Sequence, residues 1–327
     1  MRHLISLKEQ SKEDILTMLD LSLKIKSKRN AGELTNYLPN QTLIMLFEKG
    51  STRTRLSFEA GMTELGGHGI FLDKKTTQFA LTDFVHEAKA VMRFGQVLMF
   101  RAKYAKDVIT ASKQNEIPVI DACSEKYHPA QALSDILTMA EHSNGIANVK
   151  KITWLGIENN VSNTLMLACA KLGIKVYIVA PEVDPESVDE ELNQQAEETG
   201  NVVRTLDLEE ALKDTDYVHT DTWMNMEFFS AQGGPASGGA GSHVKPEFAD
   251  EYERRKETFM PYQLNTEIIE KYCPKAKIMH CMPCHLGYEI TKDAVEHNNS
   301  VIFDQAENRM HMQKAMILWL LGKENNI

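Results

Sequence analysis

The chain reads TLIMLFEKGSTRTR at residues 42–55. The first six residues form an apolar run that predicts a buried strand, and a helical pattern with Phe58 and Met62 follows. The start of a helix presents backbone N–H groups without partners and the positive end of its dipole, which together favour anions. Arg53 and Arg55 add planar guanidinium groups that match phosphate oxygens in pairs. The stretch therefore predicts an anion site at a strand-to-helix junction; the alternative is a capped surface helix with solvated arginines.

The bulk properties of the chain narrow the class of protein. At 327 residues it exceeds the usual size of one hydrophobic core, so we expect two domains. The net charge of −10 argues against nucleic acid as a partner, because such a partner requires a basic face. The first residues lack the apolar core of a signal peptide, and no apolar run reaches the roughly 18 residues that span a bilayer. We therefore expect no membrane partner and a cytoplasmic location, where the five cysteines would remain reduced.

Short apolar runs alternate with helical patterns along the whole chain. The predicted strands are residues 42–47, 69–72, 96–101, 117–120, 151–156, 175–180, 216–220, 277–281 and a last short one at 300–303. Helices are expected between them, after a first helix that opens with a capping box at Ser11 and before an apolar helix near 306–321. The alternation predicts an α/β fold of two doubly wound domains, each a parallel sheet flanked by helices, joined by interdomain helices.

Four further segments follow the Ser-Thr-Arg-Thr-Arg run in a fixed order. They are His128-Pro129-Ala130-Gln131, Asp221–Met226, His280-Cys281-Met282-Pro283 and Gln305–His311. Together they resemble the motifs of the aspartate and ornithine carbamoyltransferase family, and the similarity covers nearly the whole chain. The resemblance implies a carbamoyl-phosphate-binding domain at 1–145, completed by the C-terminal helix at about 305–327. It also implies an ornithine-binding domain at 146–304, with a Gly-rich insertion near 231–243 that is either part of a lid or a surface loop.

The resemblance also implies a reaction. A transferase of this family would move the carbamoyl group from carbamoyl phosphate to the Nδ amine of L-ornithine, giving L-citrulline and phosphate. This reaction serves arginine metabolism, either in biosynthesis or in the arginine deiminase pathway, and it uses no metal and no organic cofactor. The family assembles as homotrimers. The alternatives are a carbamoyltransferase for another amine, such as putrescine or N-acetylornithine, and a non-catalytic member that binds metabolites.

The residues expected in the site come from the matching motifs. By resemblance, the carbamoyl phosphate site contains Ser51, Thr52, Arg53, Thr54, Arg101, His128, Gln131, Cys281 and Arg309. The catalytic members of this set are Arg101, His128, Gln131, Cys281 and Arg309. The expected ornithine-binding residues are Asn160, Asp221, Asn225, Met226, Cys281 and Met282. Asn225 stands where the family has Ser, and Gln78 stands in a loop that the family extends into a neighbouring subunit's site.

Cys281 is expected near the attacking amine. A Lys-like amine has a pKa of about 10.4, so it must lose a proton before it attacks. We hypothesise that Cys281, coupled electrostatically to Asp221, favours binding of the neutral amine. The alternative for residues 280–285, with Cys273 nearby, is a zinc knuckle. That alternative lacks a second ligand pair, and adjacent residues of a strand point to opposite faces.

Overall fold

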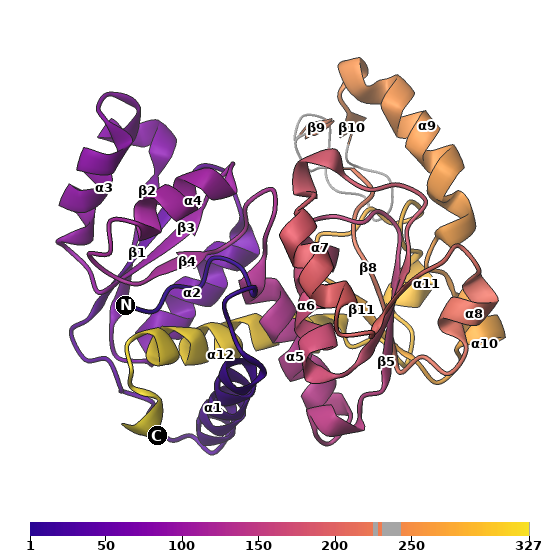
Figure 1. The fold of residues 1–327 in the computed structure, drawn as a ribbon, viewed down its shortest axis with the longest axis horizontal. Coiled ribbons are helices and arrows are strands. Elements are labelled where there is room, and N and C mark those ends of the chain that lie inside the picture. The colour runs from indigo at the N-terminus through magenta and orange to yellow at the C-terminus, as the bar shows by residue number, and fades with distance from the viewer. Residues whose placement is uncertain (225–227, 231–242, 327) are drawn as a thin grey trace.

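The computed structural model describes residues 1–224, 228–230 and 243–326. It contains two parallel sheets flanked by helices, and Figure 1 shows them in two lobes side by side. The prediction of a doubly wound α/β fold is therefore confirmed. The predicted division of the chain at residue 145 remains a prediction, and most of the expected insertion, residues 231–242, lies outside the described residues.

The first sheet lies in the lobe built from the N-terminal half of the chain. Its strands are parallel and run in the order β2-β1-β3-β4. They are β1 (Thr42–Phe47), β2 (His68–Asp73), β3 (Val97–Arg101) and β4 (Val119–Asp121). The α-helices of this part of the chain are α1 (Lys12–Asn30), α2 (Thr52–Glu64), α3 (Phe84–Met92), α4 (Ala105–Ser112) and α5 (Pro129–His142). The capping box predicted at Ser11 is present, and β1 is buried along its whole length, as in sheets covered on both faces.

The second sheet is also parallel and runs in the order β11-β8-β5-β6-β7. Its strands are β5 (Lys151–Leu155), β6 (Lys175–Val179), β7 (Val202–Arg204), β8 (Tyr217–Thr220) and β11 (Lys277–His280). The helices that follow these strands are α6 (Asn160–Leu172), α7 (Glu190–Glu197), α8 (Leu208–Leu212), α9 (Ala249–Phe259), α10 (Thr266–Tyr272) and α11 (Lys292–Val295). A short antiparallel pair, β9 (Phe229–Ser230) and β10 (His243–Val244), stands apart from both sheets.

The last helix, α12 (Ile302–Leu320), returns the chain to the first lobe. It packs against α1, α2 and α5, and Figure 1 shows it in yellow across that lobe. The predicted strand at 300–303 is wrong, because Ser300 makes a single bridge to Ile278 and Val301 then caps the helix. Val301 and Ile302 are buried at this turn from sheet to helix, so tertiary packing overrides a local pattern that suits a strand. Among the described residues, no helix combines the length and the apolar character that crossing a membrane requires.

Each sheet has one point at which the winding of the chain reverses. The reversal falls between β1 and β3 in the first sheet and between β5 and β8 in the second. Loops that leave adjacent strands at such a point diverge, and ligands bind in the crevice between them. The predicted site residues occupy these positions: Ser51 follows β1, Arg101 ends β3, Asn160 follows β5 and Asp221 follows β8.

Candidate active site

The predicted anion site is built at the start of α2. Ser51 caps this helix: its Oγ accepts a hydrogen bond from the backbone N–H of Thr54 at 3.4 Å and donates to Thr54 Oγ1 at 3.0 Å. Thr52 and Arg53 occupy the first two helical positions, where N–H groups have no partner within a helix. The capped end of α2 therefore offers donors and positive potential at the carboxyl end of β1, the arrangement that binds phosphate elsewhere.

Three arginines from different elements meet near this helix end: Arg53 on α2, Arg101 at the end of β3 and Arg309 on α12. Arg309 is 3% exposed, and its Nη2 donates to Thr54 Oγ1 at 2.9 Å. Burial, and then the charge of Arg101, lowers the pKa of Arg309 to about 10. Burial also lowers the pKa of Arg53, as does the charge of Arg101. Cations that are desolvated and repel one another in this way mark a site for a multiply charged anion.

His128 lies beside these arginines at the start of α5, and Gln131 follows on the first turn of that helix. The backbone N–H of His128 donates to Thr164 Oγ1 at 3.0 Å, which fixes the residue before Pro129 begins the helix. Burial, and then the charges of Arg309 and Arg101, lowers the pKa of His128 well below its usual value, so its imidazole is neutral at neutral pH. Gln131 is 1% exposed. Among the described residues, neither His128 Nδ1 nor Gln131 Oε1 has a hydrogen-bond partner.

The second lobe contributes a carboxylate and a thiol in direct contact. Asp221 is 7% exposed, and its Oδ1 accepts from Cys281 Sγ at 2.9 Å and from the Thr222 N–H at 2.8 Å. Its Oδ2 accepts from Asn159 Nδ2 at 3.0 Å. Burial of the thiol, and then the carboxylate of Asp221, raises the pKa of Cys281 well above its usual value. Cys281 is therefore a neutral hydrogen-bond donor to Asp221. Cys281 and Asp221 also act on the pKa of Arg53, so the two lobes face one site.

The other predicted ornithine-binding residues differ from Asp221 and Cys281 in their contacts, and two of them are not described. Asn160 Nδ2 donates to the backbone oxygen of Ser124 at 2.7 Å, across to the loop after β4 in the first lobe. Met282 is half-buried next to Cys281, and its N–H donates to His280 Nδ1 at 2.8 Å. Asn225 and Met226 lie outside the described residues. The structure therefore brings Asn160, Asp221, Cys281 and Met282 to one region, with Asn160 already bonded to the opposite lobe.

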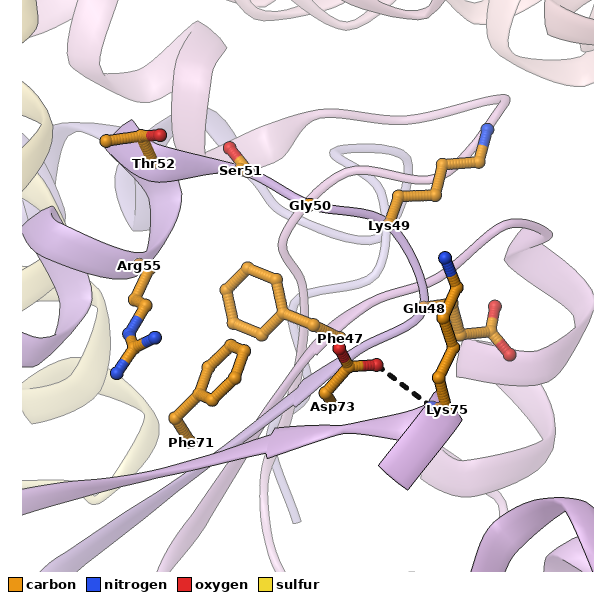
Figure 2. A pocket seen from close by; sticks show the side chains of 10 residues that line it. All are labelled: Phe47, Glu48, Lys49, Gly50, Ser51, Thr52, Arg55, Phe71, Asp73 and Lys75. Carbon is orange, nitrogen blue, oxygen red and sulfur yellow. Dashed lines mark hydrogen bonds between the residues drawn. The ribbon is translucent and has the colours of Figure 1, made fainter. Parts of the chain in front are cut away.

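A cavity of about 260 Å³ opens at the start of α2. Figure 2 shows its ten lining residues: Phe47, Glu48, Lys49, Gly50, Ser51, Thr52, Arg55, Phe71, Asp73 and Lys75. The guanidinium of Arg55 lies over the Phe71 ring at 4.0 Å, so this arginine is held apart from the cluster of Arg53, Arg101 and Arg309. Gln78 is exposed on a short 3-10 helix, Gln78–Ala80, and does not line the cavity.

The zinc alternative can be tested against the side chains. In the described part of the chain, the ligand atoms that lie within 4.8 Å of one another belong to Asp221, His280 and Cys281. Both nitrogens of His280 are engaged: Nδ1 accepts from the Met282 N–H and Nε2 bonds Glu289 Oε1 at 3.2 Å. A metal ion on His280 would have to displace one of these hydrogen bonds, so the donor set does not fit a preformed zinc knuckle.

Two family models match the chain, one for each lobe. The carbamoyl-P binding domain of aspartate/ornithine carbamoyltransferase matches residues 2–141, and the Asp/Orn binding domain matches residues 148–320. The chain belongs to the aspartate/ornithine carbamoyltransferase family. It is 36% identical to the ornithine carbamoyltransferase of Archaeoglobus fulgidus over 330 residues, covering all of both chains. It is 37% identical to that of Methanospirillum hungatei, covering 97% of this chain and 98% of the relative.

A solved structure of a carbamoyltransferase shares the fold. The ornithine carbamoyltransferase of Pyrococcus furiosus superposes with a TM-score of 0.86 at 33% identity, covering 98% of this chain and 97% of that one.

Three residues that hold the candidate site of the present chain were not predicted from its sequence. Asn159 positions Asp221, Thr164 positions His128, and Asp135 accepts from Gln131 Nε2 at 2.9 Å. Only Asn159 carried a local signal, because Asn-Asn-Val-Ser opens α6 with a capping box.

Proposed function

We propose that this carbamoyltransferase transfers the carbamoyl group of carbamoyl phosphate to the Nδ of L-ornithine, giving L-citrulline and phosphate. The observation that carries the proposal is the meeting of the cluster of Arg53, Arg101 and Arg309 with the Asp221–Cys281 pair of the other lobe. A dianion and a cationic amino acid need such opposite surroundings within one crevice. The names of the relatives point to the same acceptor.

Carbamoyl phosphate binds through both of its ends. The start of α2, from Ser51 to Thr54, holds the phosphate together with Arg53 and Arg101. Arg309, Thr54 and neutral His128 donate to the carbonyl oxygen, where negative charge develops during attack. Such a donor, placed before reaction, contributes about 2.7–4 kcal/mol to lowering the barrier. Gln131 Oε1 accepts from the carbamoyl NH₂ group.

Ornithine binds on the second lobe. Asp221 takes its α-amino group, Asn160 exchanges its bond to Ser124 for the α-carboxylate, and Cys281 and Met282 lie beside the attacking amine. The neutral Nδ attacks the carbonyl carbon, the C–N bond forms, and the bond from carbon to the phosphate oxygen breaks. The amine proton leaves with phosphate. Placing both substrates in line supplies most of the acceleration, and the roles of Asn225 and Met226 as ornithine contacts remain part of the proposal.

The test measures formation of the carbamoylated amine from carbamoyl phosphate, with ornithine, putrescine, N-acetylornithine and aspartate offered separately. Turnover with ornithine alone is the expected result. Turnover with another amine would overturn the assignment of ornithine as acceptor. No turnover with any of the four would favour a non-catalytic member of the family. Thr54→Val should lower kcat/KM by about 100-fold through loss of a donor, whereas Thr63→Val, on the exposed part of the same helix, serves as the matched control.

We further propose that the protein is a cytoplasmic homotrimer of arginine metabolism, acting in biosynthesis or in the arginine deiminase pathway. The domains are 1–145 with the C-terminal helix, and 146–304. The exposed position of Gln78 suits a loop that enters a neighbouring subunit's site. Light scattering coupled to gel filtration measures the mass in solution, and a monomer of 37.0 kDa would contradict the assembly.

A further inference from the structure

A buried network of hydrogen bonds joins the two halves of the candidate site. Its centre is Asp135, whose side chain has no exposed surface. Asp135 Oδ1 accepts from Gln131 Nε2 at 2.9 Å and from Gln305 Nε2 at 2.8 Å, and Oδ2 lies 3.3 Å from His219 Nε2. A carboxylate only accepts hydrogen bonds, so both amide side chains must turn their NH₂ groups towards it.

The orientation of Gln131 follows from this contact. Its Nε2 is bonded to Asp135, so its oxygen is the atom left over. Gln131 Oε1 is buried and has no partner among the described residues, although a buried polar atom normally has one. An acceptor held ready in this way matches a ligand that carries an N–H donor.

The same carboxylate is tied to the second lobe. Gln305 Oε1 accepts from the His280 N–H at 2.9 Å, one residue before Cys281. His219 Nδ1 bonds the backbone oxygen of Thr220 at 3.0 Å, one residue before Asp221. The His219 ring also stacks on Trp154 at 4.8 Å between centroids. Gln305 therefore links Asp135 to the backbone one residue before Cys281, and its Nε2 also lies 3.0 Å from His219 Nε2, whose ring bonds the backbone one residue before Asp221.

We propose that Asp135 is a positioning residue that selects which end of the Gln131 amide faces the carbamoyl group. This inference rests on the proposed function, because the carbamoyl NH₂ is the donor that Gln131 Oε1 would accept. Without Asp135, the amide rotates by half a turn and presents its own NH₂ to another NH₂, which leaves donors unpaired. Inorganic phosphate lacks an NH₂ group, so its binding does not depend on the orientation of Gln131.

The experiment compares stabilisation by carbamoyl phosphate and by inorganic phosphate in thermal unfolding, from which both dissociation constants follow. In Asp135→Leu we expect the preference for carbamoyl phosphate over phosphate to fall about 10-fold, with phosphate affinity within about 2-fold of wild type. Ser134→Ala is the matched control, because Ser134 is also buried on α5 and its hydroxyl donates to the backbone oxygen of Ala130, within the same helix. An unchanged preference in Asp135→Leu would overturn the proposal. If that variant does not fold, Asp135→Ala replaces it, with the same expectation.

A mutant cycle separates positioning from a general structural role. In a Gln131→Leu background, Asp135→Leu should reduce kcat/KM no further, because it acts through Gln131; independent losses that multiply would refute the idea. Asp135→Asn keeps an acceptor for Gln131 and should stay within about 5-fold of wild type. A much larger loss of activity in Asp135→Asn would instead show that the negative charge of Asp135 is needed for the reaction, and it would overturn the positioning role. The binding comparison needs no turnover. A wild-type protein without activity would therefore overturn the proposed function, while the role of Asp135 in binding would still be tested.

Discussion

Replacing Arg309 by Met should make the ligand-free protein more stable and weaken its binding of carbamoyl phosphate. Arg309 is 3% exposed, and burial together with repulsion from Arg101 lowers its pKa from 12.5 to about 10. A difference of about 2.5 in pKa corresponds to about 3 kcal/mol by which the fold disfavours the charged form. Because the lowered pKa still lies far above neutrality, the full cost is present from about pH 6 to pH 8.

Part of this gain is offset by lost contacts. The hydrogen bond from Arg309 Nη2 to Thr54 Oγ1 contributes about 1 kcal/mol, so the expected net gain in the free energy of unfolding is about 2 kcal/mol. The matched control is Arg204→Met. Arg204 Nη2 lies 2.8 Å from Glu158, whose side chain is 4% exposed, so this substitution leaves a buried carboxylate unpaired and should destabilise by about 2 kcal/mol.

The assay is urea-induced unfolding at neutral pH, with and without carbamoyl phosphate. At about 100 times its dissociation constant, carbamoyl phosphate should stabilise the wild type by about 2.7 kcal/mol, and at the same concentration it should stabilise Arg309→Met by less, because the carbonyl oxygen loses a donor. The reasoning is refuted if Arg309→Met is less stable than wild type without carbamoyl phosphate. It also fails if carbamoyl phosphate stabilises both proteins equally, because the guanidinium would then serve the fold rather than the ligand.

Three further outcomes follow from the site. Cys281→Ser keeps a donor to Asp221 and should lower kcat/KM for ornithine less than Cys281→Ala, for which about a 10-fold loss is expected; unchanged kinetics in both would remove the role of the thiol. Burial raises the pKa of Asp121 to about 8, so this group's contribution to stability is lost as pH rises from about 4 through 8; Asp121→Asn should flatten the fall in unfolding temperature that wild type shows on that rise. The lowered pKa of His128 predicts a kcat/KM profile without a limb near pH 6.5, and a limb there that His128→Gln abolishes would contradict a neutral ring.

The sequence contained enough local information to predict the sheets and to put candidate site residues at the carboxyl ends of their strands. Continuous apolar runs such as residues 42–47 form strands because both of their faces are covered, and β1 is buried throughout. Motifs at strand ends converge because parallel strands share a carboxyl edge, which placed Arg101 and Asp221 without any contact being known. The prediction of a strand at 300–303 was wrong because the apolar residues there are buried by the packing of a helix rather than within a sheet.

Contacts between distant residues could not be predicted in this way. Asp135 lies on a helix of small and apolar residues, and nothing in its neighbourhood indicates that it meets Gln305, 170 positions away. Asn160 was expected to be available to the amino acid, but it bonds Ser124 of the other lobe. The Asn160 contact depends on how the two lobes approach each other, and the Asp135 contact depends on how α12 returns to pack on α5. One sequence carries no pattern that reports either arrangement.

The geometry of α12 explains how one site can be assembled from two sheets. Gln305 and Arg309 stand four residues apart on this helix, a rise of about 6 Å on the same face. Gln305 bonds the His280 N–H of the second sheet, while Arg309 bonds Thr54 at the start of α2 beside the first. A single rigid helix therefore sets the spacing between the phosphate end of the site and the Cys281 loop. Binding both substrates in line needs that spacing to be fixed before reaction, and a buried helix provides it at lower entropic cost than a loop.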